Sequence, residues 1–119
     1  MTIWVCFNDG FISAVYDKKN DVVKVRSRRR EILEALFPEL VIHCSYTTDY
    51  RYRVFCTKKE LADVIVNRID SMDYSNFKNS VRDRDLHDLY SDFWVQHFNY
   101  QHDDPRHWNV IPVNKKKPR

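Results

Sequence analysis

Glycine is almost absent from this sequence, and several other features are missing with it. The chain of 119 residues has one glycine, Gly10, and four prolines, so most of it can form regular secondary structure. Its three cysteines are odd in number and widely spaced, which favours reduced thiols over a disulfide framework. No stretch approaches the roughly 18 consecutive apolar residues of a membrane span. These absences favour a small soluble domain that is stabilised by its core.

The composition agrees with a folded chain. Hydrophobic residues make up 43% and aromatic residues 14%, which is enough for one core in a chain of this length. The net charge of +3 suits solubility and does not by itself indicate nucleic-acid binding. The N-terminal residues lack the basic region and cleavage site of a secretory signal. We therefore expect a cytoplasmic location, in the host cytoplasm if the gene is viral.

Five runs of β-favouring residues predict strands, at residues 3–7, 11–16, 22–26, 40–46 and 50–57. Asp9-Gly10 predicts a hairpin turn between the first two, because both residues tolerate positive φ. Both faces of residues 3–7 are apolar, which predicts a strand that is central or covered on both sides. Residues 22–26 could form an exposed edge strand. The three cysteines lie in strand-like runs, where we expect them to act as small hydrophobic residues.

Capping residues and apolar spacing predict the helices. Ser27 is the expected N-cap of the first, which Pro38 ends. Thr57 and Glu60 form a capping box for the second. A short helical turn follows Ser75, and a last helix begins near Asp85. The predicted order β-β-β-α-β-β-α-α, with the short turn between the last two helices, indicates an α+β domain over residues 1–100, in which helices cover one face of an antiparallel sheet of about five strands. Residues 101–119 are expected to be an extended or disordered basic tail.

Four short motifs suggest a family. They are Gly10-Phe11-Ile12-Ser13, Asp49-Tyr50-Arg51-Tyr52-Arg53, Asp73-Tyr74-Ser75-Asn76-Phe77-Lys78, and His87 followed by Tyr90. Over about residues 1–98 their order resembles a widespread set of small bacterial and phage proteins of uncharacterised function. The resemblance implies a fold and a phage or bacterial context, and it implies no catalytic role.

The strongest functional pattern is a basic and aromatic surface. Lys24 and Arg26 alternate with core valines, three arginines follow, and two more arginines lie in the Tyr-Arg-Tyr-Arg motif. Cations beside aromatic rings suit phosphates, unstacked bases and protein interfaces. We predict a binding site formed by Lys24, Arg26, Arg28, Arg29, Arg30, Arg51, Arg53, Tyr50, Tyr52 and Lys78. A solvated charged face explains the same residues without any partner.

Three function classes remain open. The first is a non-catalytic regulatory or counter-defence protein that binds a host protein or nucleoprotein complex. The second is a direct nucleic-acid-binding protein. The third is a small metal-dependent hydrolase, with candidate groups at Asp83, Asp85, His87, Asp88, His97, His102 and His107. Because His-Glu-x-x-His, Cys-x-x-Cys and Gly-rich phosphate loops are absent from the sequence, we expect no catalytic residue, cofactor or metal.

Overall fold

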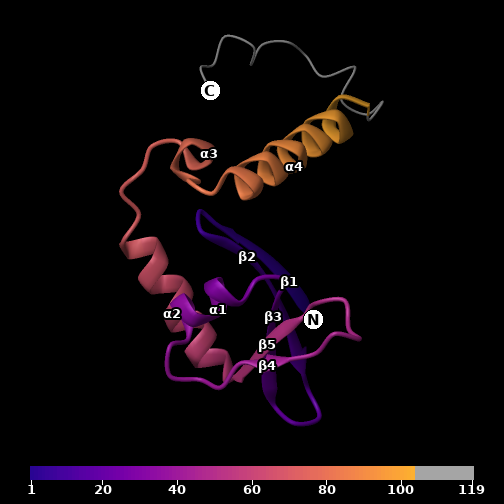
Figure 1. Cartoon of the computed structure of the whole chain (residues 1–119), viewed down its shortest axis with the longest axis vertical. Coiled ribbons are helices and arrows are strands. Elements are labelled where there is room, and N and C mark those ends of the chain that lie inside the picture. Colours follow the sequence, from indigo (N-terminus) through magenta and orange to yellow (C-terminus); the bar gives the residue numbers. More distant parts are fainter. Residues whose placement is uncertain (104–119) are drawn as a thin grey trace, which may run out of the picture.

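Strands and helices follow one another in the predicted order. The computed structural model describes residues 1–103, which form a five-stranded antiparallel sheet and four helices (Figure 1). In chain order the elements are β1 (Thr2–Phe7), β2 (Gly10–Asp17), β3 (Val22–Ser27), α1 (Arg30–Leu36), β4 (His43–Cys44), β5 (Tyr52–Cys56), α2 (Lys58–Asp70), α3 (Phe77–Ser80) and α4 (Arg84–Asp103). Across the sheet the order is β1-β2-β3-β5-β4. The α+β prediction is confirmed.

One face of the sheet, which we call the inner face, carries the core. Alternate strand residues point to it, among them Ile12, Val25 and Val54, which are fully buried. They pack against Ile32 and Leu33 of α1, and Leu61 of α2 completes the cluster. α1 and α2 therefore cover the inner face and leave the opposite, outer face free of both.

The positions of two strands differ from the sequence prediction. β1 lies at an edge of the sheet, and β3 lies in its centre. No further strand pairs with the outer edge of β1 among the described residues. On its second apolar face, Trp4 packs against the ring of Phe11, with ring centroids 5.8 Å apart. Trp4 stays 63% exposed. Because β3 pairs with a strand on each side, it is not the exposed edge strand that the sequence suggested.

The first hairpin turn also differs from the prediction. Phe7 pairs with Gly10, so the turn residues are Asn8 and Asp9. Neither Asp9 nor Gly10 has positive φ; within residues 1–103 only Asp21 does, at 50°. Gly10 is needed for a different reason. A Cβ atom at this position would lie 2.5 Å from Cβ of Ile32, so only glycine lets α1 approach the hairpin this closely.

Ser27 does not cap α1. It is the last residue of β3, and its hydroxyl donates to the Phe11 carbonyl at 3.0 Å and accepts from the Arg29 N–H at 3.2 Å. α1 begins only at Arg30, so Arg28 and Arg29 lie in the connection before the helix. With Ser27 as N-cap, Arg28, Arg29 and Arg30 would all lie in the first helical turn, but only Arg30 does.

The second hairpin is shorter than predicted. Of residues 40–46, only His43–Cys44 form a strand, β4. Cys44 is exposed on this short edge strand, Cys6 is half-buried, and Cys56 is buried. Burial, with the charge of Glu60, raises the pKa of the Cys56 thiol to about 11. The interpretation of the cysteines as small core residues therefore holds for Cys56 and fails for Cys44.

The helices after β5 begin at side-chain caps. The predicted capping box of α2 is present: Thr57 Oγ1 accepts from the Glu60 N–H at 3.0 Å, and Glu60 accepts from the Thr57 N–H at 2.8 Å. Asp83 caps α4 by accepting from the Leu86 N–H at 3.0 Å. Caps of this kind each contribute about 1 kcal/mol.

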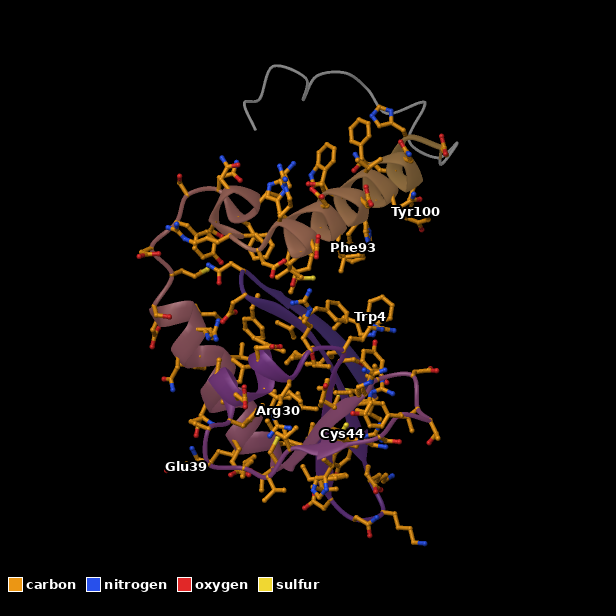
Figure 2. The ribbon with its side chains drawn as sticks, in the orientation of Figure 1. Trp4, Arg30, Glu39, Cys44, Phe93 and Tyr100 are labelled. Atoms are coloured by element: carbon orange, nitrogen blue, oxygen red, sulfur yellow. The ribbon has the colours of Figure 1, made fainter. Side chains whose placement is uncertain are left out.

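α4 lies across the end of the β1–β2 hairpin (Figure 1). The buried Tyr90 hydroxyl donates to the Phe7 carbonyl at 2.9 Å, and burial raises the pKa of this phenol. Farther along, α4 extends past the sheet, with Tyr100 on its outer end (Figure 2). The helix continues to Asp103, three residues beyond the predicted domain end, and residues 104–119 of the predicted tail lie outside the described part.

Within residues 1–103, no helix is both long enough and apolar enough to cross a membrane.

Candidate functional site

A single row of side chains crosses the outer face of the sheet. Register places Trp4 opposite Ser13, Ser13 opposite Arg26, Arg26 opposite Arg53, and Arg53 opposite His43. Residues directly opposite in antiparallel strands have Cβ atoms about 4.5–5.5 Å apart, and like charges in this position destabilise a sheet. Two arginines therefore face each other at the centre of the outer face, where folding alone would disfavour them.

Among the described residues, only neutral groups accept hydrogen bonds from these two arginines. Arg26 Nη2 donates to Ser13 Oγ at 2.7 Å. Arg53 Nη2 donates to the Tyr50 carbonyl at 2.7 Å and also to the Thr48 hydroxyl. The Nε atoms of both arginines are buried and have no acceptor within the described residues. Within residues 1–103 the pair is thus held in place without a carboxylate that would neutralise it.

Tyr50 joins a third arginine to this pair. Tyr50 is 7% exposed, and the guanidinium carbons of Arg26 and Arg28 lie 4.5 Å and 4.1 Å from the centroid of its ring. Such cation–π contacts stabilise and orient a guanidinium group. We call Arg26, Arg28, Arg53 and Tyr50 the arginine cluster. In residues 1–103 no carboxylate forms an ion pair with it.

Tyr50 reaches this position because the second hairpin is irregular. Strict alternation along residues 50–57 predicts Tyr50 on the same face as Tyr52, and opposite to Arg53. β5 begins only at Tyr52, so Tyr50 belongs to the preceding loop and packs on the outer face with the arginines. Tyr52 itself packs against the core on the inner face and is not part of the cluster.

The other predicted site residues are distributed over several places. Lys24 shares the outer face with Arg26, two residues away on β3. Arg51 lies over the exposed ring of Tyr46 at 4.5 Å, beside the cluster. Arg30 pairs with Glu34 on α1 at 3.1 Å. Lys78 lies over the ring of Trp94 at 4.8 Å, in the α3–α4 region.

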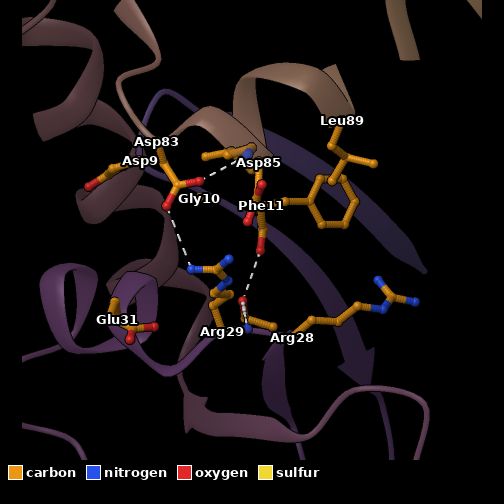
Figure 3. Close-up of a pocket in the computed structure, with 11 residues that line it drawn as sticks. Asp9, Gly10, Phe11, Arg28, Arg29, Glu31, Asp83, Asp85 and Leu89 are labelled. Carbon is orange, nitrogen blue, oxygen red and sulfur yellow. Dashed lines mark hydrogen bonds and ion pairs between the residues drawn. The ribbon is translucent and has the colours of Figure 1, made fainter. Parts of the chain in front are cut away.

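A cavity of about 450 Å³ borders the cluster at the end of the sheet (Figure 3). Arg28 lines it, and so does Arg29, whose guanidinium lies 3.6 Å from Asp83 in an ion pair. Arg28 therefore belongs to both the arginine cluster and the cavity, whereas Arg29 faces only the cavity.

Two polar residues of the site have little signal in the sequence. Ser13 and Thr48 supply the hydroxyl acceptors of the arginines. Ser13 lies in an apolar run between Ile12 and Ala14, and alternation places it on the opposite face from both. The position of its hydroxyl on the outer face is the one feature of the sequence that could have identified Ser13 as a site residue. Thr48 lies in a turn, where a threonine is ordinary.

The groups of the hydrolase hypothesis are separated. Asp83 caps α4 and pairs with Arg29, His87 lies 3.8 Å from its neighbour Asp88, and the ring of His97 packs on Phe93 at 4.4 Å. In the described part of the chain, no three histidine, cysteine or carboxylate side chains are placed to hold a metal ion. His107 lies outside the described residues.

Comparison with protein-family models, with curated proteins and with solved structures found no match to this chain.

Proposed function

We propose that this chain is a non-catalytic binding protein and that the outer face of its sheet docks on an acidic partner. The observation that carries the proposal is that Arg26 and Arg53 lie directly opposite each other and that no carboxylate of the described residues pairs with either. Such a pair costs stability, and a bound anion would remove the cost. The partner is a protein or nucleoprotein complex with an acidic surface, in a regulatory or counter-defence setting.

Three further features support a docking role. Stacking on Tyr50 restrains Arg26 and Arg28, which lowers the entropy lost when a partner binds. Trp4 and Phe55 on the same face are exposed aromatic residues, a type enriched at interfaces. Arginine and tyrosine are also the residues most often found as interface anchors.

Charge reversal next to the cluster tests this function. Lys24→Glu with Arg28→Glu reverses two cations on or beside the outer face, and we expect loss of the captured partner from a bacterial lysate. Lys18→Glu with Lys19→Glu is the matched control, because it reverses the same number of charges in the exposed β2–β3 turn. Equal retention of the partner by both double variants would contradict the proposal.

Nuclease treatment separates the two kinds of partner. We expect a protein partner to remain bound after the lysate is digested with nuclease. If capture is lost on digestion, and if binding of a labelled oligonucleotide weakens steeply with salt, the outer face binds nucleic acid directly.

A further inference from the structure

The cavity beside the arginine cluster has the size of a ligand site. It lies between the β1–β2 turn, the β3–α1 connection and the start of α4 (Figure 3). Its volume of about 450 Å³ falls within the range of roughly 300–1,000 Å³ that is typical of small-molecule sites. A single large side chain of a partner would also fit.

One wall of the cavity is apolar. Phe11 contributes its ring from β2, and Leu86 and Leu89 contribute from the first turns of α4. Leu89 is 56% exposed, and Figure 3 shows its side chain beside the Phe11 ring. Exposed leucine next to an aromatic ring favours a ligand that brings an apolar or aromatic group.

Some charged side chains around the cavity have an ion-pair partner, and others do not. Arg68 holds Asp9 through two hydrogen bonds of 2.7 and 2.9 Å, and Asp83 is shared between Arg29 and the N-terminus of α4. Within residues 1–103 Arg28 contacts the Tyr50 ring and forms no ion pair, so its guanidinium is available to a carboxylate of a ligand.

The remaining carboxylates limit what can enter. Glu31 and Asp85 also line the cavity, and within residues 1–103 neither forms an ion pair. Asp9 and Asp83 are paired with Arg68 and Arg29, whereas Glu31 and Asp85 would repel every negative group of a ligand except one held at Arg28, and this disfavours a ligand that carries several phosphates. A peptide suits this lining better, because its backbone N–H groups can donate to these carboxylates while one acidic side chain reaches Arg28.

We infer that the cavity receives an aromatic or large aliphatic side chain from an acidic segment of a partner protein, and that a neighbouring carboxylate of that segment binds Arg28. The inference rests on the proposed function and narrows it, because it makes the partner a protein. The hydrophobic residue anchors the segment, and Arg28 connects the anchor to the arginine cluster.

Short blocked peptides provide the probe. We would titrate acetyl-Asp-Phe-Asp-amide, acetyl-Asn-Phe-Asn-amide and acetyl-Asp-Ala-Asp-amide into the full chain and follow the methyl signals of Leu86 and Leu89 by NMR. We expect saturable shifts with the acidic aromatic peptide and about tenfold weaker binding of its neutral analogue, since one charge-assisted hydrogen bond is lost. The peptide with alanine should leave both leucine signals unchanged.

Variants connect the shifts to the cavity. Leu89→Asp places a carboxylate on the apolar wall and should abolish binding of the acidic aromatic peptide. Val95→Asp, also on α4 but outside the cavity lining, is the matched control and should bind as the unchanged chain does. Arg28→Gln should remove the tenfold preference for the acidic peptide. Circular dichroism checks that each variant folds, and Leu89→Ala, which should weaken binding severalfold, replaces Leu89→Asp if that variant is unfolded.

The results that would overturn the inference are distinct from those that would overturn the proposed function. Unshifted leucine signals, equal affinity for the acidic and neutral aromatic peptides, or stronger shifts with a thymidine dinucleotide would each refute the cavity as a peptide site. If Lys24→Glu with Arg28→Glu still abolishes partner capture, the proposed function survives that refutation. If the peptides bind as expected but the charge reversals leave capture unchanged, the proposed function is the one that fails.

Discussion

Replacement of Gly10 by alanine tests the closest packing contact in the fold. The added methyl group would lie 2.5 Å from Cβ and 2.7 Å from Cγ1 of Ile32, a residue that is 1% exposed. Because Cβ is attached directly to the backbone of α1, a rotamer change cannot move it away. Either α1 or the β1–β2 hairpin has to shift.

The expected cost follows from two opposing effects. Overpacking of a close-packed core costs about 1–3 kcal/mol, and the upper end applies to a contact with a Cβ atom. Gly10 lacks positive φ, so alanine is not strained there and gains about 0.4–1 kcal/mol from a less flexible unfolded chain. The net loss in the free energy of unfolding is about 2 kcal/mol. For a domain of this size it lowers Tm by roughly 8–10 °C.

Urea denaturation followed by circular dichroism measures this loss. Asn8→Ala, in the same turn, is the control and should change the free energy of unfolding by less than about 0.5 kcal/mol. Ile32→Ala removes Cγ1 and Cδ1 but keeps Cβ, so in that background, studied in sucrose to offset its own instability, Gly10→Ala should keep most of its cost. A neutral or stabilising Gly10→Ala would refute the close-contact explanation, and a cost that disappears in the double variant would show that the contact with Cβ of Ile32 is not its source.

Two further predictions concern ionisable side chains. Tyr90→Phe removes the hydrogen bond to the Phe7 carbonyl and should cost about 1 kcal/mol at neutral pH. Because the pKa of Tyr90 is raised on folding, the unchanged chain should lose stability as pH rises above the ordinary phenol value of 10.0. In urea titrations at several pH values, Tyr90→Phe should lose less stability over the same range. Equal dependence of the free energy of unfolding on pH in the two proteins would contradict this. Exposed Cys44 should react first with iodoacetamide at pH 8. Cys56, whose pKa is raised to about 11, should react far more slowly, because roughly a thousandth of it is thiolate at this pH. Peptide mass mapping checks the order, and labelling of Cys56 before Cys44 would contradict it.

The arginine cluster has a cost that the fold does not explain. Its three arginines have no ion pair within residues 1–103, although the chain places carboxylates beside Arg29, Arg30 and Arg68. Sites that bind a partner often retain residues that reduce stability in the free protein. An acidic partner would supply the missing charge.

Local patterns in the sequence determined the element order and much of the core. Alternation placed Val23 and Val25 inside and Lys24 and Arg26 outside, because strand periodicity depends on backbone geometry alone. The Thr57 and Glu60 capping box is likewise a contact between residues close in sequence, and it is present as predicted. The sequence also identified Arg26, Arg28, Arg53 and Tyr50 as candidates for one site.

Contacts between distant segments decided the rest. Strand order cannot be derived from alternation, so the edge position of β1 and the opposition of Arg26 and Arg53 came only from the sheet. The irregular loop before β5 moved Tyr50 to the outer face, and the approach of α1 gave Gly10 its role. By itself the sequence determined which residues are charged, aromatic or apolar. The tertiary structure decided which of them meet, because register, loop path and helix packing depend on the whole chain.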